Sequence, residues 1–211
     1  MSETILVTGA SAGFGQAICR RLVADGYRVI GSARRIDKLH ALQEELGEAF
    51  YPLQMDVTDL SQVDHTLASL PKDWERVDVL VNNAGLALGL APAYEAEVAD
   101  WLTMIQTNIV GLTYLTRKIL PQMVERNDGY IINLGSTAGT VPYPGANVYG
   151  ASKAFVKQFS LNLRADLAGK KIRVSNIEPG LCEGTEFSSV RFKGDEKRVE
   201  ALYRDAHAIQ P

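Results

Sequence analysis

Three residues in the second half of the chain, Ser136, Tyr149 and Lys153, have the side chains for acid–base chemistry on a carbonyl or hydroxyl group. Tyr149 and Lys153 are four residues apart in a segment of helical periodicity, so the phenol and the ammonium are expected on one face. A tyrosine titrates near ~10, and a neighbouring cation favours the phenolate and lowers its pKa. Ser136 follows an apolar run, 130–134, and its hydroxyl could hold the oxygen on which Tyr149 acts. The alternative is a surface tyrosine and a solvated lysine, because short motifs out of context are weak.

A glycine-rich turn near the N-terminus could bind a pyrophosphate. Residues 4–7 are expected to form a short buried strand, and Gly9, Gly13 and Gly15 lead from it into a helical pattern. A helix that starts directly after such a turn points backbone N–H groups and its positive dipole end at an anion. The spacing is GxxxGxG rather than GxGxxG, so a purely structural turn is the alternative.

Two arginines follow the second expected strand, 27–33. In dinucleotide folds an acid at this place holds the ribose 2′-hydroxyl, whereas arginine accommodates a 2′-phosphate. Arg34 and Arg35 therefore favour NADP over NAD. The alternative is that both side chains merely cover the start of the next helix.

The rest of the chain alternates between strands and helices. Strands are expected at 50–55, 77–81, 130–134 and 172–177, and helices at 36–46, 60–70, between Pro92 and Glu125, and from Tyr149 to Leu167. Short connections between such elements imply a parallel sheet with helices on both faces. We expect an α/β, Rossmann-type doubly wound sheet and one domain over residues 1–211, with no internal repeat beyond this alternation.

Two polar features interrupt the apolar pattern. The fourth strand opens into Asn82-Asn83-Ala84-Gly85, where small side chains leave room for a ligand at the strand's carboxyl end. Asn108 lies on the apolar face of the long helical region, where an amide without partners costs a few kcal/mol. Asn108 is therefore either a structural hydrogen-bonding residue or part of a site.

Composition argues against several functional classes. Of 211 residues, 46% are hydrophobic and 22% charged, and the net charge is −3, which fits a soluble protein without a nucleic-acid partner. No apolar run approaches membrane-spanning length and no basic leader precedes the first strand, so we expect a cytoplasmic protein. Cys19 and Cys182 form no CxxC motif, and the three histidines, His40, His65 and His207, match no metal-ligand spacing.

Taken together and in order, these motifs resemble the short-chain dehydrogenase/reductase family. They are TGASAGFG at 8–15, NNAG at 82–85, Asn108, Ser136, Tyr149 with Lys153, and Pro179-Gly180. The resemblance implies that Tyr149 donates or accepts the proton and that Ser136 orients the substrate oxygen. Lys153 would bind the nicotinamide ribose and keep Tyr149 acidic, and Asn108 would hold a water of the proton relay.

The same resemblance implies an NADP site. Its lining would comprise Gly9, Ser11, Ala12, Gly13, Phe14, Gly15, Arg34, Arg35, Asp56, Val57, Asn83, Ala84, Gly85, Tyr149, Lys153, Pro179, Gly180, Leu181, Thr185 and Phe187. Hydride would pass between the nicotinamide and the substrate carbon, while the protein supplies placement and charge.

A narrower similarity, to NADP-dependent 3-hydroxy acid dehydrogenases, is carried by residues 83–89, 148–156, 178–181, 184–188 and 190–195. Such enzymes oxidise the 3-hydroxyl of a small acid, such as serine, allo-threonine or 3-hydroxypropionate, or reduce malonic semialdehyde. Arg191 and Lys193 are the candidate partners of the carboxylate, and we favour Arg191 because its planar fork suits bidentate binding. A solvated loop charge is the alternative.

Family members usually continue for another helix and a final strand, so we expect this chain to lack that C-terminal segment. The segment helps to build the oligomer, and we expect a homotetramer at full length. Two other functions remain open. One is a short-chain reductase of another carbonyl, such as a 3-oxoacyl thioester, a sugar or a diketone. The other is an NADP-binding regulator without catalytic activity, which the fold alone would permit.

Overall fold

The computed structural model describes residues 2–204, 208 and 209. Its centre is a parallel sheet in the order β3-β2-β1-β4-β5-β6. The strands are β1 (Thr4–Thr8), β2 (Arg28–Ala33), β3 (Phe50–Gln54), β4 (Val79–Asn82), β5 (Gly129–Leu134) and β6 (Ile172–Ile177). The strand order reverses direction between β1 and β4, and in open α/β sheets a ligand crevice forms outside the carboxyl ends at that point. The expected Rossmann-type sheet is confirmed.

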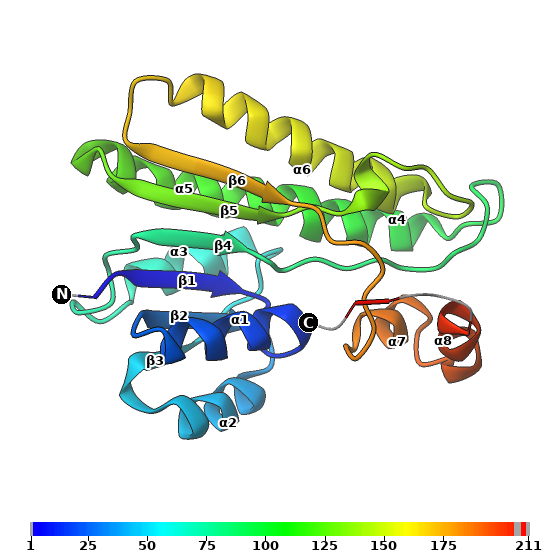
Figure 1. Ribbon diagram of the computed structural model, residues 1–211, viewed down its shortest axis with the longest axis horizontal. Coiled ribbons are helices and arrows are strands. Elements are labelled where there is room, and N and C mark those ends of the chain that lie inside the picture. The colour runs from blue at the N-terminus through cyan, green and yellow to red at the C-terminus, as the bar shows by residue number, and fades with distance from the viewer. Residues whose placement is uncertain (1, 205–207, 210–211) are drawn as a thin grey trace.

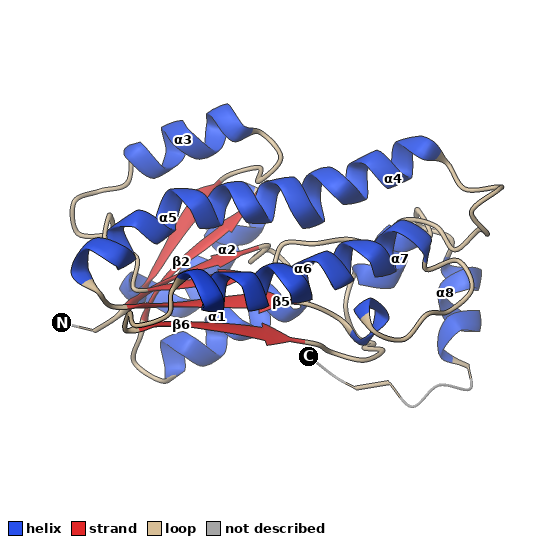
Figure 2. Ribbon diagram, turned by 90° about the horizontal axis from the view of Figure 1, so that it is seen from above, coloured by secondary structure: helices blue, strands red, loops and turns tan. Residues whose placement is uncertain are grey.

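Helices cover both faces of the sheet because alternate strand residues are apolar on both sides. One buried cluster joins Leu39 of α2 and Cys19 of α1 to Val29, and the other joins Leu115 and Leu163 to the opposite sheet face. Figure 2 shows α3, α5 and α6 lying over the strands. The helices are α1 (Gly13–Ala24), α2 (Ile36–Leu46), α3 (Leu60–Ala68), α4 (Val98–Ile105), α5 (Leu112–Arg126), α6 (Asn147–Asp166), α7 (Phe187–Arg191) and α8 (Glu196–Tyr203).

The long helical region differs from the expectation in its start and in its middle. It begins at Val98 rather than near Pro92, because a turn closed by the Glu95 N–H on the Pro92 carbonyl precedes it. Between α4 and α5, residues 106–111 adopt a π-helix, and Asn108 lies within it. Short π segments of this kind often accompany functional sites.

The segment after β6 contains two helices, α7 and α8. Figure 1 shows α7 and α8 beyond the carboxyl ends of the strands, on the same side as the start of α6. We call residues 179–191 the cover segment. Its beginning pairs with Ile209, since the Glu183 N–H donates to the Ile209 carbonyl and the Ile209 N–H to the Leu181 carbonyl. Among the described residues, no helix is both long and apolar enough to cross a membrane.

A buried chain of polar side chains fixes α5 and α6 on the sheet. The Asn82 amide donates to Thr116 Oγ1 and to Asn133 Oδ1, both at 2.9 Å. The Asn133 amide then donates to Ser160 Oγ at 2.9 Å. Buried polar groups that are all bonded in this way specify one arrangement, because any other leaves a donor unsatisfied. The helix that carries Tyr149 and Lys153 is thereby held in register with β4 and β5.

Candidate active site

A cavity of about 510 Å³ lies at the carboxyl ends of β1, β4 and β5, beneath the cover segment. Its volume falls in the range of small-molecule and cofactor sites, roughly 300–1,000 Å³. Most of the expected cofactor residues line it: Gly9, Ala12, Gly13, Phe14, Asn83, Ala84, Gly85, Tyr149, Lys153, Pro179, Gly180, Leu181, Thr185 and Phe187. Ser136 and Arg191, expected at the substrate, line the same cavity.

The floor of the cavity is the turn after β1, which interlocks with the end of β4. The N–H groups of Asn83 and Ala84 donate to Thr8 Oγ1 at 3.0 and 2.9 Å, and the Asn83 amide donates to the Thr8 carbonyl at 2.7 Å. Gly9 has a φ of +68°, and a Cβ there would lie only 2.9 Å from Asn83 Nδ2. Glycine is therefore required on both conformational and steric grounds.

The start of α1 suits an anion. Ala12, at its N-cap, provides no side-chain cap, and Ala12, Gly13 and Phe14 line the cavity. The first N–H groups of a helix have no partner within the helix, and the dipole makes them attractive to negative charge. These residues fit the pyrophosphate of a dinucleotide.

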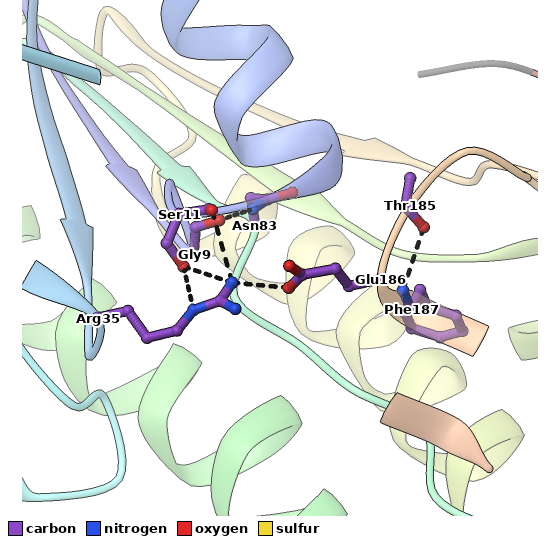
Figure 3. Close-up of polar contacts among 7 residues, drawn as sticks. All are labelled: Gly9, Ser11, Arg35, Asn83, Thr185, Glu186 and Phe187. Carbon is purple, nitrogen blue, oxygen red and sulfur yellow. Dashed lines mark hydrogen bonds and ion pairs between the residues drawn. The ribbon is translucent and has the colours of Figure 1, made fainter. Parts of the chain in front are cut away.

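The two arginines after β2 lie outside the cavity lining. Arg35 is half-exposed, and its Nη2 donates to Ser11 Oγ at 3.1 Å and to Glu186 Oε2 of the cover segment at 2.7 Å (Figure 3). The Arg35 side chain therefore points to the turn after β1, residues 9–13, rather than along α2. We call these residues the phosphate turn. Arg34 is exposed, and its carbonyl accepts from the Gln54 amide at 3.2 Å. A role for either arginine at a 2′-phosphate stays a prediction.

Four further cofactor candidates also lie outside the lining and have structural contacts. One is Ser11, whose Oγ accepts from Arg35 Nη2. Asp56 Oδ1 accepts from the N–H and the hydroxyl of Thr58, at 2.9 and 2.8 Å, in the turn that leads to α3. Val57 is buried, and Gly15 packs so closely that a Cβ there would lie 2.2 Å from the Gly9 carbonyl oxygen. Their roles in binding a cofactor are not tested by these contacts.

The structure brings Ser136, Tyr149 and Lys153 together through a close contact of two backbones. The short 3₁₀ turn Thr137–Gly139, directly after Ser136, packs on α6. A Cβ on Gly139 would lie 2.7 Å from the Lys153 carbonyl carbon, so only glycine permits this approach. Ser136, Tyr149 and Lys153 line the same cavity, and Lys153 Nζ lies 5.9 Å from the Tyr149 ring centroid. The prediction that these three groups meet is confirmed.

Burial dominates the electrostatics of both groups on α6. It raises the pKa of Tyr149, and the hydrogen bond to Ser136 opposes this only in part, with a smaller lowering from Arg191. Burial lowers the pKa of Lys153 to about 8, although its Nζ donates to the Leu134 carbonyl at 2.7 Å. The sequence predicted a lowered tyrosine pKa, which is wrong for this structure because desolvation outweighs the neighbouring cations.

Asn108 is buried, and both ends of its side-chain amide bond to protein groups. Its amide donates to the Leu86 carbonyl at 2.8 Å and to Ser152 Oγ at 3.0 Å, and its Oδ1 accepts from the Leu86 N–H at 2.9 Å. The π segment of the helix presents this side chain to the chain just beyond β4. Asn108 thus fixes the wall of the cavity at Leu86 against α6, and its part in a proton relay stays a prediction.

Arg191 is not the solvated loop charge that was the alternative. It ends α7, is 5% exposed, and its Nε donates to the Gly89 carbonyl at 3.0 Å and its Nη2 to Tyr143 Oη at 3.2 Å. The guanidinium carbon lies 5.8 Å from the Tyr149 ring centroid. Lys193, the other candidate, instead pairs with Asp100 at 2.9 Å.

Sequence reasoning missed several residues of this cavity. Tyr143, Leu90 and Val141 all line it. Tyr143 stands between Pro142 and Pro144, so an aromatic residue in a stiff loop was an available signal. Glu186 also lines the cavity, within the stretch 179–187 that was expected at the cofactor. No group of three His, Cys, Asp or Glu residues within the described ranges is placed to hold a metal, and His207 lies outside those ranges.

The buried lysine predicts a pH dependence of stability. The pKa of Lys153 is about 8 in the folded chain, below its ordinary value of 10.5. Between these values the unfolded chain binds more protons at this residue, so its contribution to the free energy of unfolding rises with pH. We expect Lys153→Met to abolish that rise, measured by urea unfolding from about pH 7 to about pH 9.5.

Subtracting the variant's curve from that of the wild type removes other titrations in this range. One of these is Cys19, whose pKa burial raises to about 12. The matched control is Lys197→Met, an exposed lysine of α8, which should run parallel to the wild type. Parallel curves for wild type and Lys153→Met would contradict the burial of a charged lysine.

Comparison with known proteins agrees with this geometry. The chain is 57% identical over 207 residues, 98% of its length and 84% of the relative's, to an NADP-dependent 3-hydroxy acid dehydrogenase of Escherichia coli O6:H1. It is 50% identical to a serine 3-dehydrogenase of Agrobacterium fabrum, covering 99% of this chain and 83% of that one. A solved closed form of serine dehydrogenase complexed with NADP+ matches with a TM-score of 0.96 at 57% identity, covering 98% of this chain and 83% of that one. The model of the short chain dehydrogenase family matches residues 3–196, and the chain belongs to this family.

Proposed function

We propose that the chain is an NADP-dependent oxidoreductase that acts on the 3-hydroxyl or 3-oxo carbon of a small hydroxy acid. The observation that carries the substrate class is Arg191, a buried cation in the same cavity as Tyr149. Within the described part of the chain no ion pair joins Arg191 to an acidic residue. A buried cation without a counterion is costly, and an anionic substrate would supply the missing charge.

The residues of the cavity fit a dinucleotide. The uncapped start of α1 would take the pyrophosphate, Lys153 the nicotinamide ribose, and Arg34 and Arg35 the 2′-phosphate. The names of two relatives, an NADP-dependent dehydrogenase and a serine dehydrogenase complexed with NADP+, support this choice of cofactor. When bound, NADP supplies the acceptor or donor of the hydride.

The protein itself must donate or accept the proton of the reaction. The raised pKa keeps Tyr149 protonated at neutral pH, so it is ready to donate to the oxygen of a 3-oxo substrate. Ser136, which lines the same cavity, would hold that oxygen in place. In the oxidative direction Tyr149 must first become a phenolate in order to accept the proton, and a charged Lys153 near its ring would favour that form. We also propose that Asn108 holds a water for the relay.

Arg191 would anchor the carboxylate. Its Nε and Nη2 are held by Gly89 and Tyr143, so the planar group is fixed in orientation before substrate binds. Preorganised charged groups bind with less loss of side-chain entropy than mobile ones. The guanidinium carbon lies 5.8 Å from the Tyr149 ring centroid. This separation supports a substrate as short as a three-carbon acid, with its carboxylate on Arg191 and its 3-oxygen near Tyr149.

We propose one NADP-binding domain over residues 1–211 and a cytoplasmic location. We also propose a homotetramer for the full-length protein. Exposed apolar side chains on α4 and α6, namely Val98, Leu102, Phe155 and Leu161, support a helical interface.

The direct test is the initial rate of NADP+ reduction with L-serine, L-allo-threonine and 3-hydroxypropionate, with NAD+ in parallel. We expect turnover with NADP+ and a clear loss with NAD+, because arginine rather than an acid follows β2. Reduction of an uncharged ketone, a sugar or a 3-oxoacyl thioester in place of these acids would support the alternative, a reductase of another carbonyl.

Tyr149→Phe separates catalysis from mere cofactor binding. We expect turnover to fall by about 10²-fold or more, because the proton donor is lost, while NADPH binding followed by fluorescence is retained. Unchanged turnover in this variant would refute the role of Tyr149. Binding of NADPH by the wild type without turnover of any substrate would favour the non-catalytic regulator.

Arg191→Met tests the anchor, with 3-hydroxypropionate and its uncharged amide as paired substrates. We expect kcat/KM for the acid to fall about 10- to 100-fold, the scale of one charge-assisted interaction, and the amide to lose far less. The ratio of the two is the readout, because loss of the contacts to Gly89 and Tyr143 lowers both rates alike. The control Lys197→Met should keep the wild-type ratio, and an unchanged ratio in Arg191→Met would refute the anchor.

A further inference from the structure

An ion pair joins the cover segment to Arg35, two residues after the end of β2. Glu186 Oε2 lies 2.7 Å from Arg35 Nη2, and the same nitrogen donates to Ser11 Oγ of the phosphate turn (Figure 3). The two charged side chains are about half-exposed, at 44% and 52%. This pair joins residues 151 positions apart in the sequence.

The neighbours of Glu186 fix its position over the site. Thr185 covers the phosphate turn so closely that a Cβ on Gly13 would lie 3.2 Å from the Thr185 side chain. Phe187 packs on the other side, with its ring centroid 5.9 Å from that of Tyr149. Glu186 therefore lies between Thr185, which contacts the phosphate turn, and Phe187, which packs on Tyr149. Its carboxylate points toward Arg35.

The Glu186 carboxylate is bound to the Arg35 guanidinium, the group that a 2′-phosphate would need. Under the proposed function, on which this inference rests, Arg35 receives the 2′-phosphate of NADP. A phosphate and a carboxylate both bind a guanidinium through charge-assisted hydrogen bonds, and side by side they repel each other. The 2′-phosphate must therefore displace Glu186 from Arg35. A dinucleotide without that phosphate leaves the pair intact.

We propose that Glu186 is a specificity-determining residue that competes with the 2′-phosphate of the cofactor for Arg35. Its carboxylate weakens the binding of adenosine ligands that carry a 2′-phosphate and has no effect on those without one. Since Glu186 belongs to the cover segment, arrival of the 2′-phosphate also releases that segment from Arg35.

Binding of two fragments measures this competition without turnover. The fragments are 2′,5′-ADP, which carries the 2′-phosphate, and 5′-AMP, which does not, titrated by calorimetry. We expect Glu186→Gln to bind 2′,5′-ADP about two- to fivefold more tightly, the scale of one exposed ion pair, and 5′-AMP with unchanged affinity. The difference should shrink at high salt because the pair is exposed to solvent.

The matched control is Glu200→Gln, which makes the same change of net charge at an exposed residue of α8. It should leave both affinities as in the wild type. Equal tightening of both fragments by Glu186→Gln, or no tightening of 2′,5′-ADP, would overturn the proposal.

A second cycle tests that the effect passes through Arg35. In an Arg35→Gln background, Glu186→Gln should no longer alter the affinity for 2′,5′-ADP. A persistent effect there would show a general charge effect and overturn the competition. Binding to the wild type distinguishes failure of the proposed function from failure of this inference. If the wild type has no preference for 2′,5′-ADP over 5′-AMP, NADP as the cofactor is refuted. A wild-type preference that Glu186→Gln leaves unchanged refutes this inference alone.

Discussion

The interlock between the turn after β1 and the end of β4 is the constraint on which the site depends. Thr8 accepts hydrogen bonds of 2.7 to 3.0 Å from Asn83 and from the Ala84 N–H, across the point where the strand order reverses. These bonds satisfy polar groups that have no partner in the sheet. The ends of β1 and β4 can therefore separate without leaving an unsatisfied group. The crevice that results receives the start of α1 from one side and Lys153 from the other, which makes it a site for a long, charged ligand.

Two buried cations give this cavity its chemical character. Lys153 and Arg191 are 7% and 5% exposed, and Glu186, the acid among its described lining residues, is committed to Arg35. The cavity therefore carries positive charge that water hardly reaches. Such a site favours ligands with several negative groups, and it strengthens electrostatic effects on any proton that moves within it. Both buried charges lie close to the ring of Tyr149, the proposed proton donor.

The sequence alone predicted the sheet, the glycine-rich turn and the meeting of Ser136, Tyr149 and Lys153, because these depend on local periodicity and on the carboxyl ends of parallel strands. It did not predict α7 or the burial of Arg191, since the partners of Arg191 are Gly89 and Tyr143, 102 and 48 positions away. It also gave the wrong direction for the pKa of Tyr149. Spacing shows which charges are near, whereas desolvation depends on everything packed around the group.

The contact between the Thr137–Gly139 turn and α6 divides the site into a fixed part and a variable part. Close contact of backbone atoms where Gly139 meets Lys153 constrains the separation of Ser136 from Tyr149, which limits how far neighbouring side chains can move these two residues. The cover segment is held by backbone pairing with Ile209 and by side chains, among them Glu186, Arg191 and Phe187. Substitutions accumulating in that segment would alter which molecule is accepted and leave the reaction itself intact. Proteins of this fold can thus come to act on many different substrates through changes in the cover segment.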